Sequence, residues 1–207
     1  MRLLGIACLS MALASCGPLI DLGNKSADKI YALTYNGPKT MLSQAAGSVF
    51  VDSFMVSAGL DSEMILAQTP EGEQLQISGI SWADQPADML RDYLVTMIRI
   101  EGGMRAYGEG SLDLPVGCRL GVHLNDFQLD SPMTGDGNNL GTVRVGLNLT
   151  LLQINSGKLL GEYQVSQAIP VTDRSNDAIL NAFQSGTKAM IKQAAMVLKQ
   201  HAASCIR

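Results

Sequence analysis

Residues 142–151 carry the strictest pattern in the chain. Valine or leucine stands at every second position, and threonine, arginine, glycine and asparagine fill the positions between them. Because successive side chains of a strand point to opposite faces, this alternation predicts a strand with one face in a core and the other in solvent. Such one-sided burial is typical of antiparallel sheets. A turn at 155–158 and an apolar return over 163–171 complete a predicted hairpin.

Other segments of the chain also have strand-like patterns. We expect further strands at 29–35, 48–56, 63–68, 74–80 and 118–129. The Pro-Glu-Gly sequence at 70–72 predicts a hairpin between the third and fourth of these. Segment 48–56 is apolar on both faces, which favours a buried central strand. In 118–129 the alternation slips near Asn125, which indicates a bulge or bend.

Two segments change to a helical period. Pro86 suits a first helical turn, apolar residues follow at spacings of three and four over 89–98, and Gly102 ends the pattern. Ser175 is the predicted N-cap of a terminal helix with an apolar stripe over 179–197. The order strands, helix, strands, helix predicts an α+β fold. In it, two amphipathic helices pack on one face of a largely antiparallel sheet.

The first residues of the chain are typical of an export signal. Arg2 precedes an apolar run over 3–14, which is too short to cross a bilayer as a helix of roughly 20 residues. The run ends in Leu-Ala-Ser-Cys, which resembles the bacterial lipobox, although an ordinary signal followed by an accidental cysteine is the alternative. We expect a signal peptide over 1–15, a lipidated tether over 16–28 and one domain over 29–207.

Cys16 is the residue that we expect to carry the lipid. A diacylglyceryl group on its thiol and an N-acyl chain such as palmitate would supply the membrane affinity. Gly17 follows it, and by resemblance to sorted lipoproteins this favours the outer membrane, with the domain facing the periplasm. The formal net charge of −4 and the lack of a basic block argue against nucleic acid as a partner.

The sequence leaves two questions open: whether the remaining cysteines form a disulfide, and whether the single tryptophan lies in the core or in an interface. Cys8 lies in the signal, so only Cys118 and Cys205 remain for the exported domain. The periplasm is oxidising, but the sequence leaves open whether these two pair. Trp82 precedes the first helix, where it either contributes to an interface or covers the core.

The chain offers little that points to catalysis. His123 and His201 are the only histidines, and each has an ordinary explanation, on the outer side of a strand and near a helix end. Asp84, Asp88 and Asp92 recur every four residues, as on the solvated face of a helix start. No metal-ligand spacing, phosphate-binding loop or nucleophile elbow is present. We therefore expect that the protein is not an enzyme and that it binds no metal and no cofactor. The lipid on Cys16 would be its only non-protein group.

Several short motifs follow one another in a family-like order. They are KIYAL at 29–33, VFVD at 49–52, GLD at 59–61, ISWAD at 80–84, NDF at 125–127 and AILNAF at 178–183. Over about residues 29–203 the chain resembles the ABC-type transport auxiliary lipoprotein family, the paraquat-inducible C-type lipoproteins.

The resemblance implies a non-enzymatic subunit of an Mce-type lipid transport system. Its partners would be an Mce-domain protein and the associated ABC transporter complex, which it would dock at the outer membrane. The resemblance is also compatible with a homo-oligomer. Two alternatives stay open: an accessory lipoprotein of another envelope assembly machine, and a monomeric periplasmic binder of a hydrophobic ligand, which predicts a closed apolar pocket.

Overall fold

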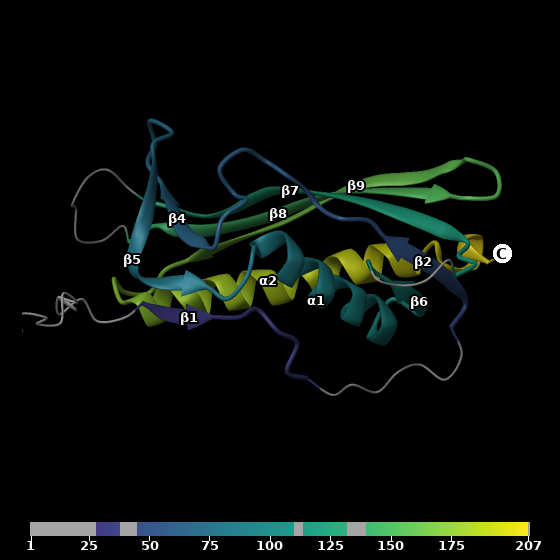
Figure 1. The fold of residues 1–207 in the computed structure, drawn as a ribbon, viewed down its shortest axis with the longest axis horizontal. Coiled ribbons are helices and arrows are strands. Elements are labelled where there is room, and N and C mark those ends of the chain that lie inside the picture. The colour runs from purple at the N-terminus through teal and green to yellow at the C-terminus, as the bar shows by residue number, and fades with distance from the viewer. Residues whose placement is uncertain (1–27, 38–44, 110–113, 132–139, 207) are drawn as a thin grey trace, which may run out of the picture.

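Strand β7 (Cys118–Asp130) is the longest strand, and the rest of the sheet is arranged along its two edges (Figure 1). The computed structural model describes residues 28–37, 45–109, 114–131 and 140–206. The other strands are β1 (Lys29–Tyr31), β2 (Gly47–Val51), β3 (Met55–Val56), β4 (Met64–Gln68), β5 (Gln74–Trp82), β6 (Met104–Tyr107), β8 (Thr142–Gln153) and β9 (Leu159–Pro170). The helices are α1 (Pro86–Ile100), α2 (Asn176–Lys199) and the 3-10 turn η1 (Ala202–Cys205).

The two edges of β7 are paired in different ways. One edge pairs antiparallel with β8 along the length of both strands, and β8 pairs antiparallel with β9. The other edge pairs in parallel with three short strands in succession, which are β2, β3 and β4. Beyond them, β5 pairs with β4, β1 with β5, and β6 with β2. The sheet is mixed, its longest pairings are antiparallel, and the predicted α+β class is confirmed.

Both long helices lie on one side of the sheet (Figure 1). Helix α2 packs along β8 and β9, and α1 packs against α2. Gly186 allows the close approach, because a Cβ there would lie 3.2 Å from side-chain atoms of Val145 and Ile169. The apolar positions of β8 that alternate in the sequence are buried under these helices, which accounts for the pattern over 142–151.

The local signals in the sequence give the helix starts correctly. Pro86 is the first residue of α1, and the Ser175 hydroxyl accepts a hydrogen bond from the Ala178 amide at the start of α2. The β4–β5 and β8–β9 hairpins form as predicted. The pairing of β7 with β8 shifts register between Leu124 and Asp126, at the predicted bulge.

Two expectations about strands are wrong in detail, and one strand of the structure was not predicted. The segment 48–56 is divided into β2 and β3, because the chain leaves the edge of β7 between the two short pairings. The segment 29–35 is a strand only as far as Tyr31, which pairs with Trp82, the last residue of β5. Strand β6 was not expected, and its four residues gain their partner from β2 rather than from a long pattern of their own.

The C-terminal turn closes the fold against the starts of β2 and β7. Cys118 and Cys205 form a disulfide, with Cα atoms 5.0 Å apart. A Cβ at Gly117 would lie 2.0 Å from the carbonyl oxygen of Cys205, and one at Gly47 would lie 2.3 Å from that of Ala202. Glycine is therefore required at both positions by close approach of backbone to backbone.

Removal of the disulfide should destabilise the domain. We expect the Cys118→Ala/Cys205→Ala variant to lose about 3 kcal/mol of unfolding free energy in urea, since the bond closes a long loop in the unfolded chain. Reductant should lower the stability of the wild type towards that of the variant and leave the variant unchanged. A wild type whose denaturation midpoint is insensitive to reductant would contradict the pairing.

The close approach at Gly117 can be tested without touching the cysteines. Gly117→Ala should cost roughly 2 kcal/mol of unfolding free energy, because the backbone of the C-terminal turn must move. Gly121→Ala, in the strand that Gly117 immediately precedes, is the matched control. Its Cβ would meet Thr150 at 3.8 Å, an ordinary contact, so we expect little loss. Equal losses in the two variants would show that the C-terminal turn is not the cause.

Candidate functional site

Trp82 is a core residue. Its side chain is 3% exposed and packs between Phe127 and Phe183, with ring centroids 5.4 Å and 5.3 Å away. Phe127 and Phe183 also contact each other, so the three rings join β5, β7 and α2. The alternative in which Trp82 forms an interface is wrong for this reason: the ring has almost no surface left for a partner.

The two histidines have separate local partners. His123 lies on β7, where its Nε2 is 3.2 Å from the hydroxyl of Ser57. His201 follows α2, and its ring is hydrogen-bonded to the hydroxyl of Tyr163 on β9. Among the described residues, no group of three or more His, Cys, Asp or Glu side chains could hold a metal ion. The histidines therefore act as polar links between neighbouring elements.

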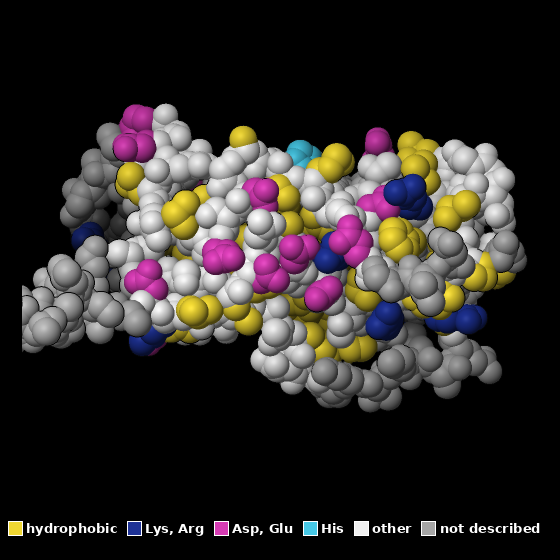
Figure 2. Space-filling view, in the orientation of Figure 1, with side chains coloured by type: hydrophobic (Ala, Val, Ile, Leu, Met, Phe, Trp, Pro, Cys, Tyr) yellow, Lys and Arg dark blue, Asp and Glu magenta, His cyan; other side chains and the backbone are white. Residues whose placement is uncertain are grey.

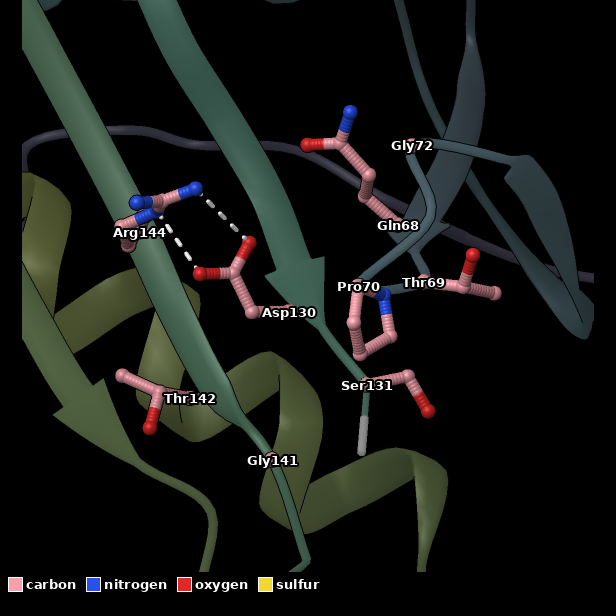
Figure 3. A pocket seen from close by; sticks show the side chains of 9 residues that line it. All are labelled: Gln68, Thr69, Pro70, Gly72, Asp130, Ser131, Gly141, Thr142 and Arg144. Atoms are coloured by element: carbon pink, nitrogen blue, oxygen red, sulfur yellow. Dashed lines mark hydrogen bonds and ion pairs between the residues drawn. The ribbon is translucent and has the colours of Figure 1, made fainter. Parts of the chain in front are cut away.

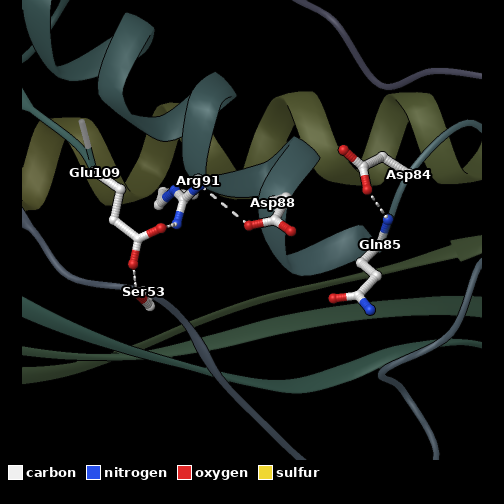
Figure 4. A network of polar contacts seen from close by, with 6 residues as sticks. All are labelled: Ser53, Asp84, Gln85, Asp88, Arg91 and Glu109. Atoms are coloured by element: carbon white, nitrogen blue, oxygen red, sulfur yellow. Dashed lines mark hydrogen bonds and ion pairs between the residues drawn. The ribbon is translucent and has the colours of Figure 1, made fainter.

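The acidic residues around the start of α1 are tied to their own helix or exposed. Asp84 accepts a hydrogen bond from the Gln85 amide, Asp88 forms an ion pair with Arg91, and Asp92 is exposed. Figure 4 shows the first two pairs near one end of the helix. This arrangement matches the predicted solvated face.

Arg91 also leads to a polar network that the sequence did not indicate. Its guanidinium donates to Glu109, 2.9 Å away in the segment after β6, and Glu109 is hydrogen-bonded to Ser53 between β2 and β3 (Figure 4). The Ser53 hydroxyl, and secondly the Arg91 charge, hold the pKa of Glu109 below its usual value. The network fastens together three segments that are far apart in the sequence, which is why no local pattern indicates it.

One hollow lies between the β4–β5 turn and the adjoining ends of β7 and β8 (Figure 3). Its volume is about 420 Å³, and Asp130 and Arg144 form an ion pair in its wall. The lining residues are Gln68, Thr69, Pro70, Gly72, Asp130, Ser131, Gly141, Thr142 and Arg144. A polar wall of this kind suits water better than an acyl chain.

A second hollow, of about 400 Å³, lies between the segment that follows β1 and the two helices. Tyr35 and Tyr93 pack in its wall with ring centroids 5.8 Å apart, and Lys188 stands beside them. Burial, and secondly Tyr35, raise the pKa of Tyr93. Neither hollow is the closed apolar pocket that a monomeric binder of hydrophobic ligands would need.

Cys16, the predicted attachment point of the lipid, lies outside the described residues, as do residues 17–27. None of the helices in the described ranges is long and apolar enough to cross a membrane.

The side chains described above do not identify a function, but comparison with known families identifies the family. Residues 31–195 match the model of the ABC-type transport auxiliary lipoprotein component. The chain belongs to this family. The match runs from the last residue of β1 to the last turns of α2 and so includes all of β2 to β9. Lipoprotein character and association with ABC-type transport are properties of the family to which this auxiliary lipoprotein belongs.

Solved structures share the fold of this auxiliary lipoprotein at low sequence identity. Protein XCC0632 from Xanthomonas campestris is 19% identical, with a TM-score of 0.65 over 85% of this chain and 96% of its own. The hypothetical protein CT253 from Chlamydia trachomatis is 8% identical, with a TM-score of 0.53 over 78% of this chain and 99% of its own. No curated protein matches the sequence. These likenesses establish the fold alone.

The polar network of this auxiliary lipoprotein predicts a measurable titration. Ser53→Ala should raise the pKa of Glu109 towards its usual value in a carboxyl NMR titration, because the hydroxyl is the main cause of the lowered pKa. Since the folded pKa lies below the unfolded one, the network stabilises the fold above the usual pKa of glutamate. This stabilisation is lost as the pH falls through the folded pKa.

Ser57→Ala is the control, because that hydroxyl contacts His123 and not Glu109. A Glu109 pKa that does not change in Ser53→Ala would contradict the network.

Proposed function

We propose that this protein is an outer-membrane-anchored auxiliary lipoprotein of an Mce-type lipid transport system. It carries its lipid on Cys16, faces the periplasm, and docks an Mce-domain protein that works with an ABC transporter. The observation that carries the proposal is the family match over residues 31–195. A lipobox-like sequence ending at Cys16 lies a short distance before the matched region.

The tether limits how far the domain can move from the membrane that holds the lipid. Residues 17–28 can span at most about 40 Å when extended, which keeps the domain close to the membrane that holds Cys16. Attachment raises the effective concentration of the domain near a membrane-bound partner without any new contact. Each buried methylene of the acyl chains adds about 0.8 kcal/mol to membrane affinity, so several chains hold the protein firmly.

The side chains support a docking role rather than a catalytic one. His123 and His201 are each hydrogen-bonded to a neighbouring hydroxyl group. Neither hollow gathers side chains suited to catalysis. The structure contributes a mixed sheet that carries both long helices on one side. A homo-oligomer stays a prediction from the resemblance.

Affinity purification from native membranes tests the proposal. We expect the C-terminally tagged protein, solubilised in mild detergent, to retain an Mce-domain protein and ABC transporter subunits in mass spectrometry. The N-terminal peptide should begin at Cys16 and carry three acyl chains. Cys16→Ala is the control, which should be lost from the membrane fraction and recover less of the partner.

Recovery of a different envelope machine with the acylated protein would sink the Mce assignment and favour the accessory alternative. Recovery of the acylated protein alone, even after gentle crosslinking, would leave a monomeric role. An unmodified Cys16 in the mature protein would contradict the anchor itself.

A further inference from the structure

Strand β9 leaves one long edge of the sheet without a partner strand among the described residues. It has 12 residues and pairs only with β8. At the other ends of the sheet lie β1, with three residues, and β6, with four. Short end strands are a common way in which proteins avoid pairing with another chain. The edge of β9 has no such protection by length.

The hydrogen bond at the end of β9 identifies the backbone groups on its free edge. The Val171 amide donates to the Gly141 carbonyl, in register with the β8–β9 pairing. Hydrogen-bonded pairs alternate along an antiparallel pairing, so the odd-numbered residues from 163 to 169 point their amides and carbonyls at β8. The even-numbered residues point these groups away from β8. They are Glu162, Gln164, Ser166 and Ala168, and all four are exposed.

The side chains along this edge do little to keep another strand away. Lysine, proline and bulges commonly block an edge strand. Between Gly161 and Ile169, however, Glu162 is the only charged residue, and the proline of β9 stands at its last position. The shift of register between β8 and β9 lies before Gly161. Charge is plentiful elsewhere on the molecule, since Figure 2 shows acidic side chains gathered over α1. The stretch 161–169 is therefore an uninterrupted and nearly uncharged edge.

Helix α2 packs along β9 and continues this surface. Gln193 of α2 is hydrogen-bonded to Gln167 of β9. Ala189 and Met196 are four residues before and three residues after Gln193, so they lie on the same side of the helix. These three α2 residues are exposed, Met196 by 53%, and none is charged. We call residues 162–168 of β9 with Ala189, Gln193 and Met196 the β9 edge surface.

We propose that the β9 edge surface binds the same surface of a second copy of the chain. The two β9 strands pair antiparallel about a two-fold axis, and the two sheets become one. Unpaired amides and carbonyls of a strand are complemented by those of another strand. A second β9 matches this edge in length, whereas β1 and β6 are too short to pair with all of it.

The register that pairs the whole free stretch has Val165 of both copies at the axis. It places Gln164 opposite Ser166 of the second copy, and Glu162 opposite Ala168 of the second copy. Every outward-facing residue between 162 and 168 then has a hydrogen-bonding partner. The two Glu162 carboxylates are about 20 Å apart in this register. Because screening in physiological salt acts over about 8 Å, these like charges do not oppose the pairing.

The same register brings the two α2 helices together at Met196. On either side of Val165, Tyr163 is hydrogen-bonded to His201, and Gln167 to Gln193. Met196 lies between those two α2 positions, so it comes close to the axis and meets Met196 of the second copy. Lys192, one turn away, is exposed and long enough to turn its charge into water. The contact therefore adds apolar burial to the strand pairing.

Sedimentation velocity and amide exchange test the pairing on the purified protein in mild detergent. We expect a dimer that dissociates to a monomer on dilution. Ser166→Pro should give the monomer at every concentration, because it removes an outward amide and its ring blocks an added strand. Proline is tolerated on an edge where the amide faces away from the paired strand, so the denaturation midpoint should change little. In the wild type, the amides of Gln164 and Ala168 should exchange at least roughly tenfold more slowly than in Ser166→Pro.

A second variant and two matched controls complete the design. Met196→Glu leaves β9 intact but places two like charges at the axis, so it should weaken the dimer at least roughly tenfold. Ser166→Ala keeps the outward amide and should keep the dimer. Met55→Glu adds the same charge at a methionine on β3 that is 64% exposed, away from β9, and should also keep the dimer.

Three results would overturn this inference. They are a wild type that is monomeric at every concentration, a dimer that survives both Ser166→Pro and Met196→Glu, and an oligomer whose Gln164 and Ala168 amides exchange as fast as those of Ser166→Pro. A monomer whose amides are protected only after an envelope extract is added would also overturn it, in favour of a strand from another protein. The inference goes beyond the proposed function and does not depend on it, because neither the lipid nor the transporter enters the pairing.

Discussion

The backbone of β7 sets the condition that the rest of the structure must meet. Its two edges carry hydrogen-bonding groups that are costly to bury without a partner. One long strand, β8, satisfies one edge, whereas the other edge is divided among β2, β3 and β4. Three separate parts of the N-terminal half must therefore return to one strand of the C-terminal half. This makes the domain a single unit in which neither half has a complete sheet.

The sequence predicts the parts of this fold that depend on near neighbours. The β8 alternation, the Pro86 helix start, the Ser175 cap and the bulge after Leu124 are all local patterns, and all four occur. The parallel pairings of β7 join segments that are far apart in the sequence. The sequences of the short strands do not indicate which strand each one pairs with. For the same reason β6, with four residues, has no sufficient pattern of its own.

The candidate sites also differ in whether near neighbours in the sequence or distant contacts in the fold determine them. The position of Trp82 before an amphipathic helix favours the core over an interface, and the contacts with Phe127 and Phe183 decide for the core. The network of Arg91, Glu109 and Ser53 joins α1 to the segment after β6 and to the segment between β2 and β3, which only the folded chain brings together.

For the exported protein that we propose, the Cys118–Cys205 bond makes the timing of export part of the folding problem. A chain that crosses a membrane N-terminus first delivers Cys118 to the oxidising side 87 residues before its partner. Throughout that interval its thiol is free for exchange with any other thiol or disulfide that it meets. Only when α2 has arrived and packed can the correct partner displace such a mixed disulfide. We therefore expect the maturation of this protein, unlike its final stability, to depend on the thiol-exchange enzymes of its compartment.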